Sequence, residues 1–213
     1  MGTLKQIAVA LDKGDQARVA ELTGQAIEQQ LPAKEILDGG LIAGMSVVGE
    51  KFRKHEIFLP NVLISARAMY AGLDLLEPLL LEQNASMAGK AVIGSVQGDQ
   101  HDIGKNLVGI MLKGSGFEVI DLGSDVSPEQ FVDAAVESGA KVIGMSALLT
   151  TTMPVMKKVV DLVKERNLDG ELKTIIGGAP VSSDYAKEIG ADAYAFDAPS
   201  AVDRVKELMA KSA

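Results

Sequence analysis

Two patterns of hydrophobic residues divide this chain. Through residues 19–76 the apolar positions recur three and four residues apart, which is the spacing of amphipathic helices. Asp15 and Pro32 suit helix starts, and Pro60 fits the first turn of a helix that follows a break. The pattern predicts a domain of four helices over residues 1–85.

From Lys90 onward, short runs of β-branched residues alternate with longer helical segments. Ser127 suits a helix start, with Gln130 at the position that a capping box requires. The alternation predicts a doubly wound parallel sheet, and therefore an α/β domain over residues 86–213. The small and polar residues 84–89 are expected to link the two domains. The five predicted strands cover residues 91–96, 118–122, 141–146, 174–176 and 193–196.

Charge and composition exclude several kinds of partner and several classes of protein. The 21 basic and 29 acidic residues give a net charge of −8 with no basic block, which argues against nucleic acid and anionic membranes as partners. There is no cysteine, so the sequence predicts neither a disulfide framework nor a thiolate metal site. No stretch is apolar for the roughly 20 residues that a membrane helix needs, and the start of the chain lacks a signal-like segment. We therefore expect a globular, cytoplasmic protein.

The candidate chemistry centres on a glycine-bounded loop, residues 98–106, that directly follows the first predicted strand. Open parallel sheets bind ligands beyond the carboxyl ends of their strands, so His101 is expected to face a binding site. The only other histidine, His55, lies in a charged segment typical of a solvated surface. Protein ligands alone would be too few for a metal site, but a metal held by an organic cofactor needs only one axial ligand. Asp99 can reach the imidazole, fix its tautomer and leave the second nitrogen for a metal.

Other ligand-binding loops fit these residues less well. The spacing from Gly98 to Gly104 is one residue too long for a P-loop, and Asn106 stands where that loop has a magnesium-binding Ser or Thr. The glycines are also too widely spaced for a dinucleotide fingerprint. A lone histidine is commonly a solvated residue, and paired glycines commonly mark an ordinary strand-to-helix turn. The position of the loop in the predicted sheet favours a binding role for His101.

Three motifs occur in order along the second predicted domain: Asp-x-His-x-x-Gly at Asp99, His101 and Gly104, Ser-x-Leu at Ser146 and Leu148, and Gly-Gly at Gly177 and Gly178. These motifs resemble those of cobalamin-binding proteins. Each follows a predicted strand, and residues 44–69 look like the helical cap domain of methionine synthase and its relatives. The resemblance covers essentially the whole chain and implies a four-helix cap followed by a flavodoxin-like, five-stranded parallel sheet. The chain is most similar to the free-standing corrinoid proteins of methanogens and acetogens.

The resemblance also implies how a cofactor is held. The cofactor is cobalamin or a related cobamide whose lower base leaves the cobalt, so that His101 becomes the axial cobalt ligand in a base-off, His-on state. Asp99 and Thr152 then complete a relay that links protonation to the oxidation state of the cobalt. The implied cofactor-binding residues are Gly98, Asp99, Gln100, His101, Asp102, Ile103, Gly104, Ser146, Leu148, Thr150, Gly177, Gly178 and Ala198, and the implied cover of the upper cobalt face consists of Phe52, Leu59 and Val62.

The same resemblance implies a methyl carrier in one-carbon metabolism that is not catalytic by itself. A substrate-specific corrinoid methyltransferase methylates the cobalt, and a second methyltransferase passes the methyl group from methylcobalamin to tetrahydrofolate or a thiol. A reductive activase is a further implied partner. The cap is expected to swing about a hinge at residues 84–89 while a partner docks. Two alternatives stay open: a subunit of a cobalamin-dependent isomerase, and a corrinoid sensor or storage module.

Overall fold

The computed structural model describes residues 2–82 and 88–211. These residues form two compact units, the first made mostly of residues before 88 and the second of residues after it. The predicted boundary between residues 85 and 86, and most of the predicted linker, lie outside the described residues. Gly89, at the end of that linker, already opens the first strand.

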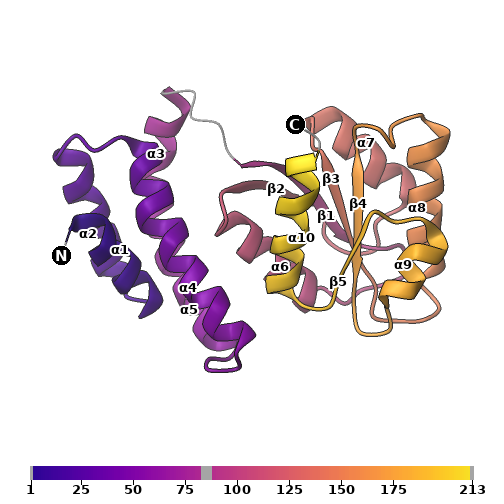
Figure 1. The fold of residues 1–213 in the computed structure, drawn as a ribbon, viewed down its shortest axis with the longest axis horizontal. Coiled ribbons are helices and arrows are strands. Elements are labelled where there is room, and N and C mark those ends of the chain that lie inside the picture. Colours follow the sequence, from indigo (N-terminus) through magenta and orange to yellow (C-terminus); the bar gives the residue numbers. More distant parts are fainter. Residues whose placement is uncertain (1, 83–87, 212–213) are drawn as a thin grey trace. The chain divides into compact units, whose positions relative to one another are not determined.

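The first unit is helical throughout (Figure 1). Asp15 begins the second helix as predicted, because its carboxylate accepts a hydrogen bond from the backbone N–H of Arg18 at 3.0 Å. Three short elements, α3, η1 and α4, follow one another without a gap, so the described part of this unit contains four helical segments. The helices are α1 (Thr3–Asp12), α2 (Gln16–Glu28), α3 (Ala33–Ile36), the π-helix η1 (Leu37–Ile42), α4 (Ala43–Arg53) and α5 (Leu59–Glu82).

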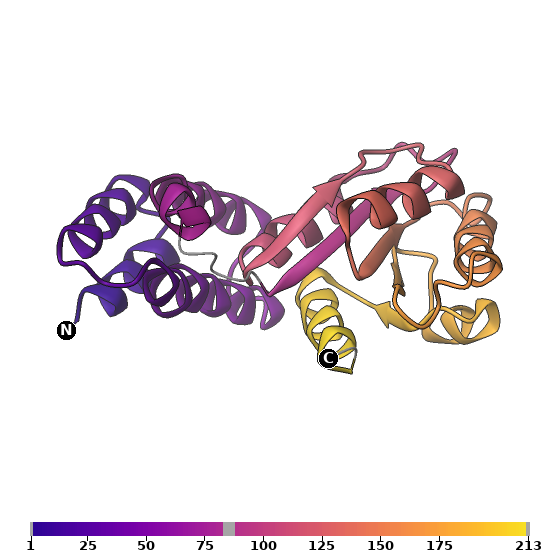
Figure 2. The ribbon, with the colours of Figure 1, turned by 90° about the horizontal axis from the view of Figure 1, so that it is seen from above.

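Close helix contacts involve glycines that the hydrophobic pattern did not single out. A Cβ added to Gly40 of η1 would lie 3.2 Å from Ile7 Cγ2 of α1. One added to Gly44 of α4 would lie 3.0 Å from the backbone of Ala8. The absence of side chains at these glycines lets η1 and α4 approach α1 closely, and Figure 2 shows the helices of this unit side by side.

The second unit contains a parallel sheet with the strand order β2-β1-β3-β4-β5. This confirms the predicted doubly wound, flavodoxin-like arrangement. Each strand lies within two residues of its predicted bounds, because buried β-branched residues define the strand interiors. The strands are β1 (Gly89–Ser95), β2 (Phe117–Asp121), β3 (Val142–Ser146), β4 (Lys173–Gly177) and β5 (Ala193–Ala195).

Helices cover both faces of this sheet (Figure 1). On one face α6 (Ile103–Lys113) and α10 (Ala198–Lys211) pack against the strands. The other face is covered by α7 (Pro128–Ser138), α8 (Pro154–Glu165) and α9 (Ser183–Ile189). In the described residues, none of the helices combines the length and apolar character needed to cross a membrane.

The direction of chain progression through the sheet reverses between β1 and β3. From β1 the chain moves outward to β2, and from β3 it moves the opposite way to β4 and β5. The loops after β1 and β3 therefore leave toward opposite faces of the sheet, which is the position where open α/β sheets commonly bind ligands. The predicted capping box at Ser127 is also present, with reciprocal hydrogen bonds to Gln130.

Candidate functional site

The histidine loop, residues 96–102, connects β1 to α6 at this reversal point. Asp99 is fully buried in the loop, whereas the His101 side chain is 52% exposed. Asp99 Oδ1 lies 2.8 Å from His101 Nδ1 and also accepts the backbone N–H of His101 at 3.1 Å. With the carboxylate ionised, Nδ1 carries the proton that it donates, and Nε2 is the nitrogen left for a ligand.

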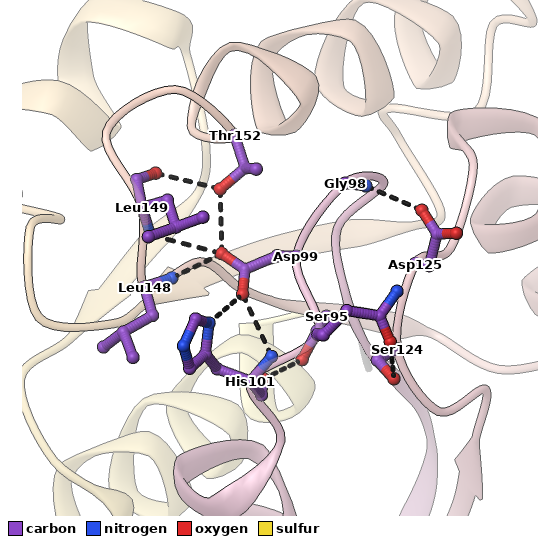
Figure 3. A network of polar contacts seen from close by, with 10 residues as sticks. Ser95, Gly98, Asp99, His101, Ser124, Asp125, Leu148, Leu149 and Thr152 are labelled. Atoms are coloured by element: carbon purple, nitrogen blue, oxygen red, sulfur yellow. Dashed lines mark hydrogen bonds and ion pairs between the residues drawn. The ribbon is translucent and has the colours of Figure 1, made fainter.

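The other oxygen of Asp99 joins the histidine loop to the loop after β3 (Figure 3). Oδ2 accepts hydrogen bonds from the backbone N–H groups of Leu148 at 2.7 Å and Leu149 at 3.2 Å. Thr152 Oγ1 lies 2.8 Å from the same oxygen. The structure thus brings together Asp99, His101 and Thr152, the three residues for which the family resemblance implies a relay.

These hydrogen bonds determine the charge of Asp99. Burial by itself raises the pKa of this carboxyl group, but the backbone N–H of Leu148, the His101 side chain, the Thr152 hydroxyl and the His101 N–H together hold the pKa well below its usual range. Asp99 is therefore an anion at neutral pH. A buried anion with several fixed donors holds the loop and the imidazole in one orientation.

Thr152 has two acceptors within reach of one hydroxyl proton. Its Oγ1 lies 2.8 Å from Asp99 Oδ2 and 2.9 Å from the carbonyl oxygen of Leu149. Ionised Asp99 is the stronger acceptor, so we assign the proton to the bond with Asp99. The carbonyl of Leu149 is the alternative acceptor if Asp99 becomes protonated.

Large apolar side chains beside the imidazole are exposed. Ile103 is 71% exposed, Leu148 43% and Leu149 42%. A Cβ added to Gly104 would meet no heavy atom of the described residues within 4 Å, so protein packing does not require glycine there. Exposed apolar groups around a held imidazole, with open space above a glycine, suit a broad and largely apolar ligand. Gln100 and Asp102 are also exposed in this loop.

Other predicted cofactor residues lie along the carboxyl ends of β3, β4 and β5. Ser146 ends β3 opposite Gly177 of β4. Gly178 has a φ of 127°, and a Cβ there would lie 1.9 Å from the carbonyl oxygen of Ala147. The close approach of the loop after β3 therefore requires this glycine whether or not a ligand binds. Thr150 is exposed, whereas Ala198 is buried at the start of α10 against the core.

The predicted cap residues lie in the helical unit. Phe52 of α4 and Leu59 of α5 are half-buried, and the neighbouring Phe58 is 68% exposed. Val62 is fully buried, which places its side chain in the core of this unit rather than on its surface. His55 is exposed with a left-handed backbone after α4, as expected for a surface residue.

Sequence reasoning missed side chains that support the histidine loop from β1 and β2. Ser95 is fully buried, and its hydroxyl donates to the carbonyl oxygen of His101 at 2.6 Å. Lys105 has only 3% of its side chain exposed, and its Nζ lies 2.6 Å from both carboxylate oxygens of Asp121. Asp125 accepts the backbone N–H of Gly98 at 2.7 Å. Spacing along the chain gave no signal for these contacts, because they join segments that meet only in the folded sheet.

Comparison with known families explains this arrangement. Residues 89–206 match a family described as "B12 binding domain", and residues 3–77 match a second family with the same description. The chain belongs to the B12-binding family. It is 43% identical to a corrinoid protein of Desulfitobacterium hafniense, over 99% of this chain and 99% of that protein. The identification from sequence motifs is thereby confirmed.

Further relatives include a corrinoid protein and a solved structure with the same two-part architecture. The chain is 47% identical to dimethylamine corrinoid protein 1 of Methanosarcina acetivorans, over 85% of each chain. Among solved structures, a chain of the methanol:cobalamin methyltransferase complex of Methanosarcina barkeri has 31% identity and a TM-score of 0.87, covering 98% of this B12-binding chain and 80% of that one. The helical part followed by a parallel sheet is thus the architecture of this family.

Proposed function

We propose that this B12-binding protein carries a methyl group on the cobalt of a bound cobamide between two methyltransferases. The observation that carries the proposal is the half-exposed imidazole of His101, held at Nδ1 by the buried carboxylate of Asp99. The names of the relatives support it, because they include corrinoid proteins for methylated amines and a methanol:cobalamin methyltransferase complex.

The residues present fit a base-off, His-on cobamide. His101 Nε2 would be the axial ligand, the exposed Ile103 and Leu148 would lie against the corrin ring, and Gly104 would leave room for it. Ser146, Thr150, Gly177 and Gly178 would hold the nucleotide tail along the carboxyl ends of β3 and β4. The bound cobamide supplies a cobalt centre that can accept and release a methyl group.

The chain's own contribution is orientation and control of one proton. Asp99 holds the proton on His101 Nδ1, so the nitrogen aimed at the metal carries its lone pair. Thr152 stabilises the anionic form of Asp99 through its hydroxyl. In the proposed relay, Asp99 and Thr152 would thus keep the imidazole in one tautomer and one orientation.

Partner proteins would supply the substrate chemistry. We infer a substrate-specific methyltransferase that loads the methyl group and a second one that delivers it to tetrahydrofolate or a thiol, with a reductive activase restoring the cofactor. The helical unit would act as a cap in which Phe52 and Leu59 shield the methylated face, and Val62 would support them from the unit's core. Shielding is needed because reduced cobalt is a strong nucleophile that water and oxidants must not reach.

The test begins with the chain reconstituted with cob(II)alamin. Electron paramagnetic resonance should show nitrogen coupling from a protein imidazole, and stopped-flow absorbance should show methyl transfer only after a cognate methyltransferase is added. Coupling from a protein imidazole that persists in His101→Ala, or multiple turnover by the isolated holoprotein, would overturn the proposal. Binding of cobalamin without transfer by any partner methyltransferase would favour a storage or sensor role.

A matched glycine pair tests the fit to the ring. Gly104→Ala should not destabilise the apoprotein, because the added methyl group meets no heavy atom of the described residues and alanine favours the helical conformation of α6. It should weaken cobalamin binding by about tenfold or more if the ring occupies that space. Gly98→Ala should instead destabilise the apoprotein, since Gly98 has a φ of 84°.

A further inference from the structure

The loop between β2 and α7, residues 122–127, lies beside the histidine loop and is bonded to it at two adjacent residues (Figure 3). Asp125 Oδ1 accepts the backbone N–H of Gly98 at 2.7 Å. The backbone N–H of Asp125 donates to the carbonyl oxygen of Asp99 at 3.1 Å. One residue of this loop thus holds both sides of the turn that carries the buried carboxylate.

The backbone of Asp125 is in an uncommon conformation that makes these two bonds possible. Its φ is 60°, in the left-handed region that most non-glycine residues avoid. Asp and Asn tolerate this region better than other residues, since their short side chains can bond to nearby backbone groups. Gly98 has a φ of 84°, so the turn it forms is one that few residues could adopt. Two uncommon backbone conformations therefore meet at the Asp125–Gly98 bond.

The loop that presents Asp125 is itself fixed at both ends. At its start, Asp121 accepts the N–H of Gly123 at 2.9 Å and pairs with the buried Lys105 of α6. The carbonyl of Gly123 accepts the N–H of Ser95 at 2.9 Å, and Val126 donates to the carbonyl of Ser95 at 3.0 Å. These hydrogen bonds hold the loop in place and so fix the position of the Asp125 carboxylate.

We propose that Asp125 is a positioning residue for the metal-binding imidazole. It acts through the backbone of Gly98 and Asp99, whose placement determines where the Asp99 carboxylate meets His101. The inference rests on the proposed function, because it assigns Asp125 a task only if His101 binds cobalt. Without Asp125 the turn samples other conformations, and the imidazole spends less time in the orientation that binds the metal.

Three substitutions separate the acceptor from the backbone strain. Asp125→Asn keeps an oxygen acceptor and tolerance for positive φ, Asp125→Gly keeps only the tolerance, and Asp125→Ala loses both. In the apoprotein, hydrogen exchange at the Gly98 amide should accelerate by about tenfold or more in the Gly and Ala variants. It should change by less than about threefold in the Asn variant, which keeps a neutral hydrogen bond.

The second readout is the fraction of protein-bound cob(II)alamin that shows imidazole nitrogen coupling. We expect this fraction to fall in Asp125→Gly and Asp125→Ala and to recover in Asp125→Asn. Ser124→Ala is the matched control, since the Ser124 hydroxyl lies 3.5 Å from Gln100 Oε1 on the same pair of loops. It should leave both readouts unchanged.

The experiment distinguishes a failure of the proposed function from a failure of the inference about Asp125. If the unaltered protein shows no imidazole coupling, the proposed function fails, whatever Asp125 does. If the unaltered protein shows coupling and Asp125→Gly keeps it in full, Asp125 does not position the imidazole. Unchanged Gly98 exchange in Asp125→Gly would overturn the inference in the apoprotein as well, without any cofactor. A loss of coupling in Asp125→Asn equal to that in Asp125→Gly would show that the acceptor is not the cause.

Discussion

Two carboxylates join neighbouring segments of the same sheet, one at each end. At the carboxyl ends of the strands, Asp99 joins the loops after β1 and β3. At the amino ends, Asp192, just before β5, accepts the backbone N–H of Thr174 at 2.8 Å and its hydroxyl at 3.0 Å. Each network uses a carboxylate, a threonine hydroxyl and backbone N–H groups.

The two networks differ in what the carboxylate oxygens contact. The contacts of Asp192 tie β4 to β5, and Lys173 adds a further ion pair at 3.5 Å. Asp99 instead devotes one oxygen to His101, an exposed imidazole whose second nitrogen faces outward from the carboxylate. The same chemistry thus stabilises one end of the sheet and, in the function we propose, orients a ligand-binding imidazole at the other. What separates them is their place in the sheet, because Asp99 lies at the carboxyl ends of the strands where the strand order reverses, the common position for ligand binding in open α/β sheets.

The largest effect should come from removing the imidazole. His101→Ala should abolish the protein-imidazole nitrogen coupling in protein-bound cob(II)alamin and change its absorbance spectrum, because His101 is the one histidine in the sequence of the second unit. Cobamide should still bind through its tail, with lower affinity. His55→Ala removes the other, exposed histidine and should leave the spectrum unchanged. Binding studied by absorbance titration, with both variants in parallel, checks this expectation.

The next largest effects are expected on the free energy of unfolding when Asp99 or Asp192 is changed to asparagine. Asp99→Asn should lower the free energy of unfolding of the apoprotein by about 2–3 kcal/mol, since one amide cannot accept from all the donors around Asp99. Asp192→Asn should cost about 1 kcal/mol, because its side chain is 32% exposed and water can replace the lost bonds. Urea unfolding followed by circular dichroism measures both. Equal costs would contradict the contrast between the two networks.

The dependence of stability on pH should show how strongly the network around Asp99 stabilises its ionised carboxylate. The pKa of Asp99 is lower in the folded protein than in the unfolded chain, where it is about 3.9. Its contribution to stability is therefore fully present above that value, and it is lost as the pH falls toward the lower pKa of the folded state. Asp99→Asn should remove this contribution, so its stability should depend less on pH between about 5 and 3 than that of the unaltered protein. Parallel acid dependence in the two proteins would contradict the assignment.

The smallest effects should come from the threonines. Thr152→Val and Thr174→Val should each cost about 0.5–1 kcal/mol by removing a buried hydroxyl, and the corresponding Ser variants should recover most of this loss. Of these two variants, only Thr152→Val should also change the reduction potential of the bound cobalt, because Thr152 contacts Asp99 and Thr174 contacts Asp192 instead. Potentiometric titration of the two valine variants makes the comparison. A shift in Thr174→Val would mean that the two networks are coupled.

Local patterns were enough to predict much of this protein. Runs of buried β-branched residues located all the strands, and Asp15 and Ser127 marked helix starts that the structure bears out. The contact between Asp99 and His101 was also foreseeable, because two residues on one loop can meet regardless of the rest of the fold. The family motifs added Thr152, which no local argument could place.

The π-helical turn and the burial of Val62 were not predictable from periodicity. The turn depends on how closely η1 approaches α1, and Val62 has the same apolar character whether it faces a core or a ligand.

The sequence by itself determined which segments are strands and helices and which loop carries the histidine. These properties depend on the spacing of apolar residues and on side chains close together in the chain. Only the tertiary structure decided what supports that loop. Asp125 reaches Gly98, and Lys105 reaches Asp121, only after β2 pairs with β1. Hydrogen bonds between distant segments leave no periodic trace in a sequence, because they depend on where the sheet brings two loops together.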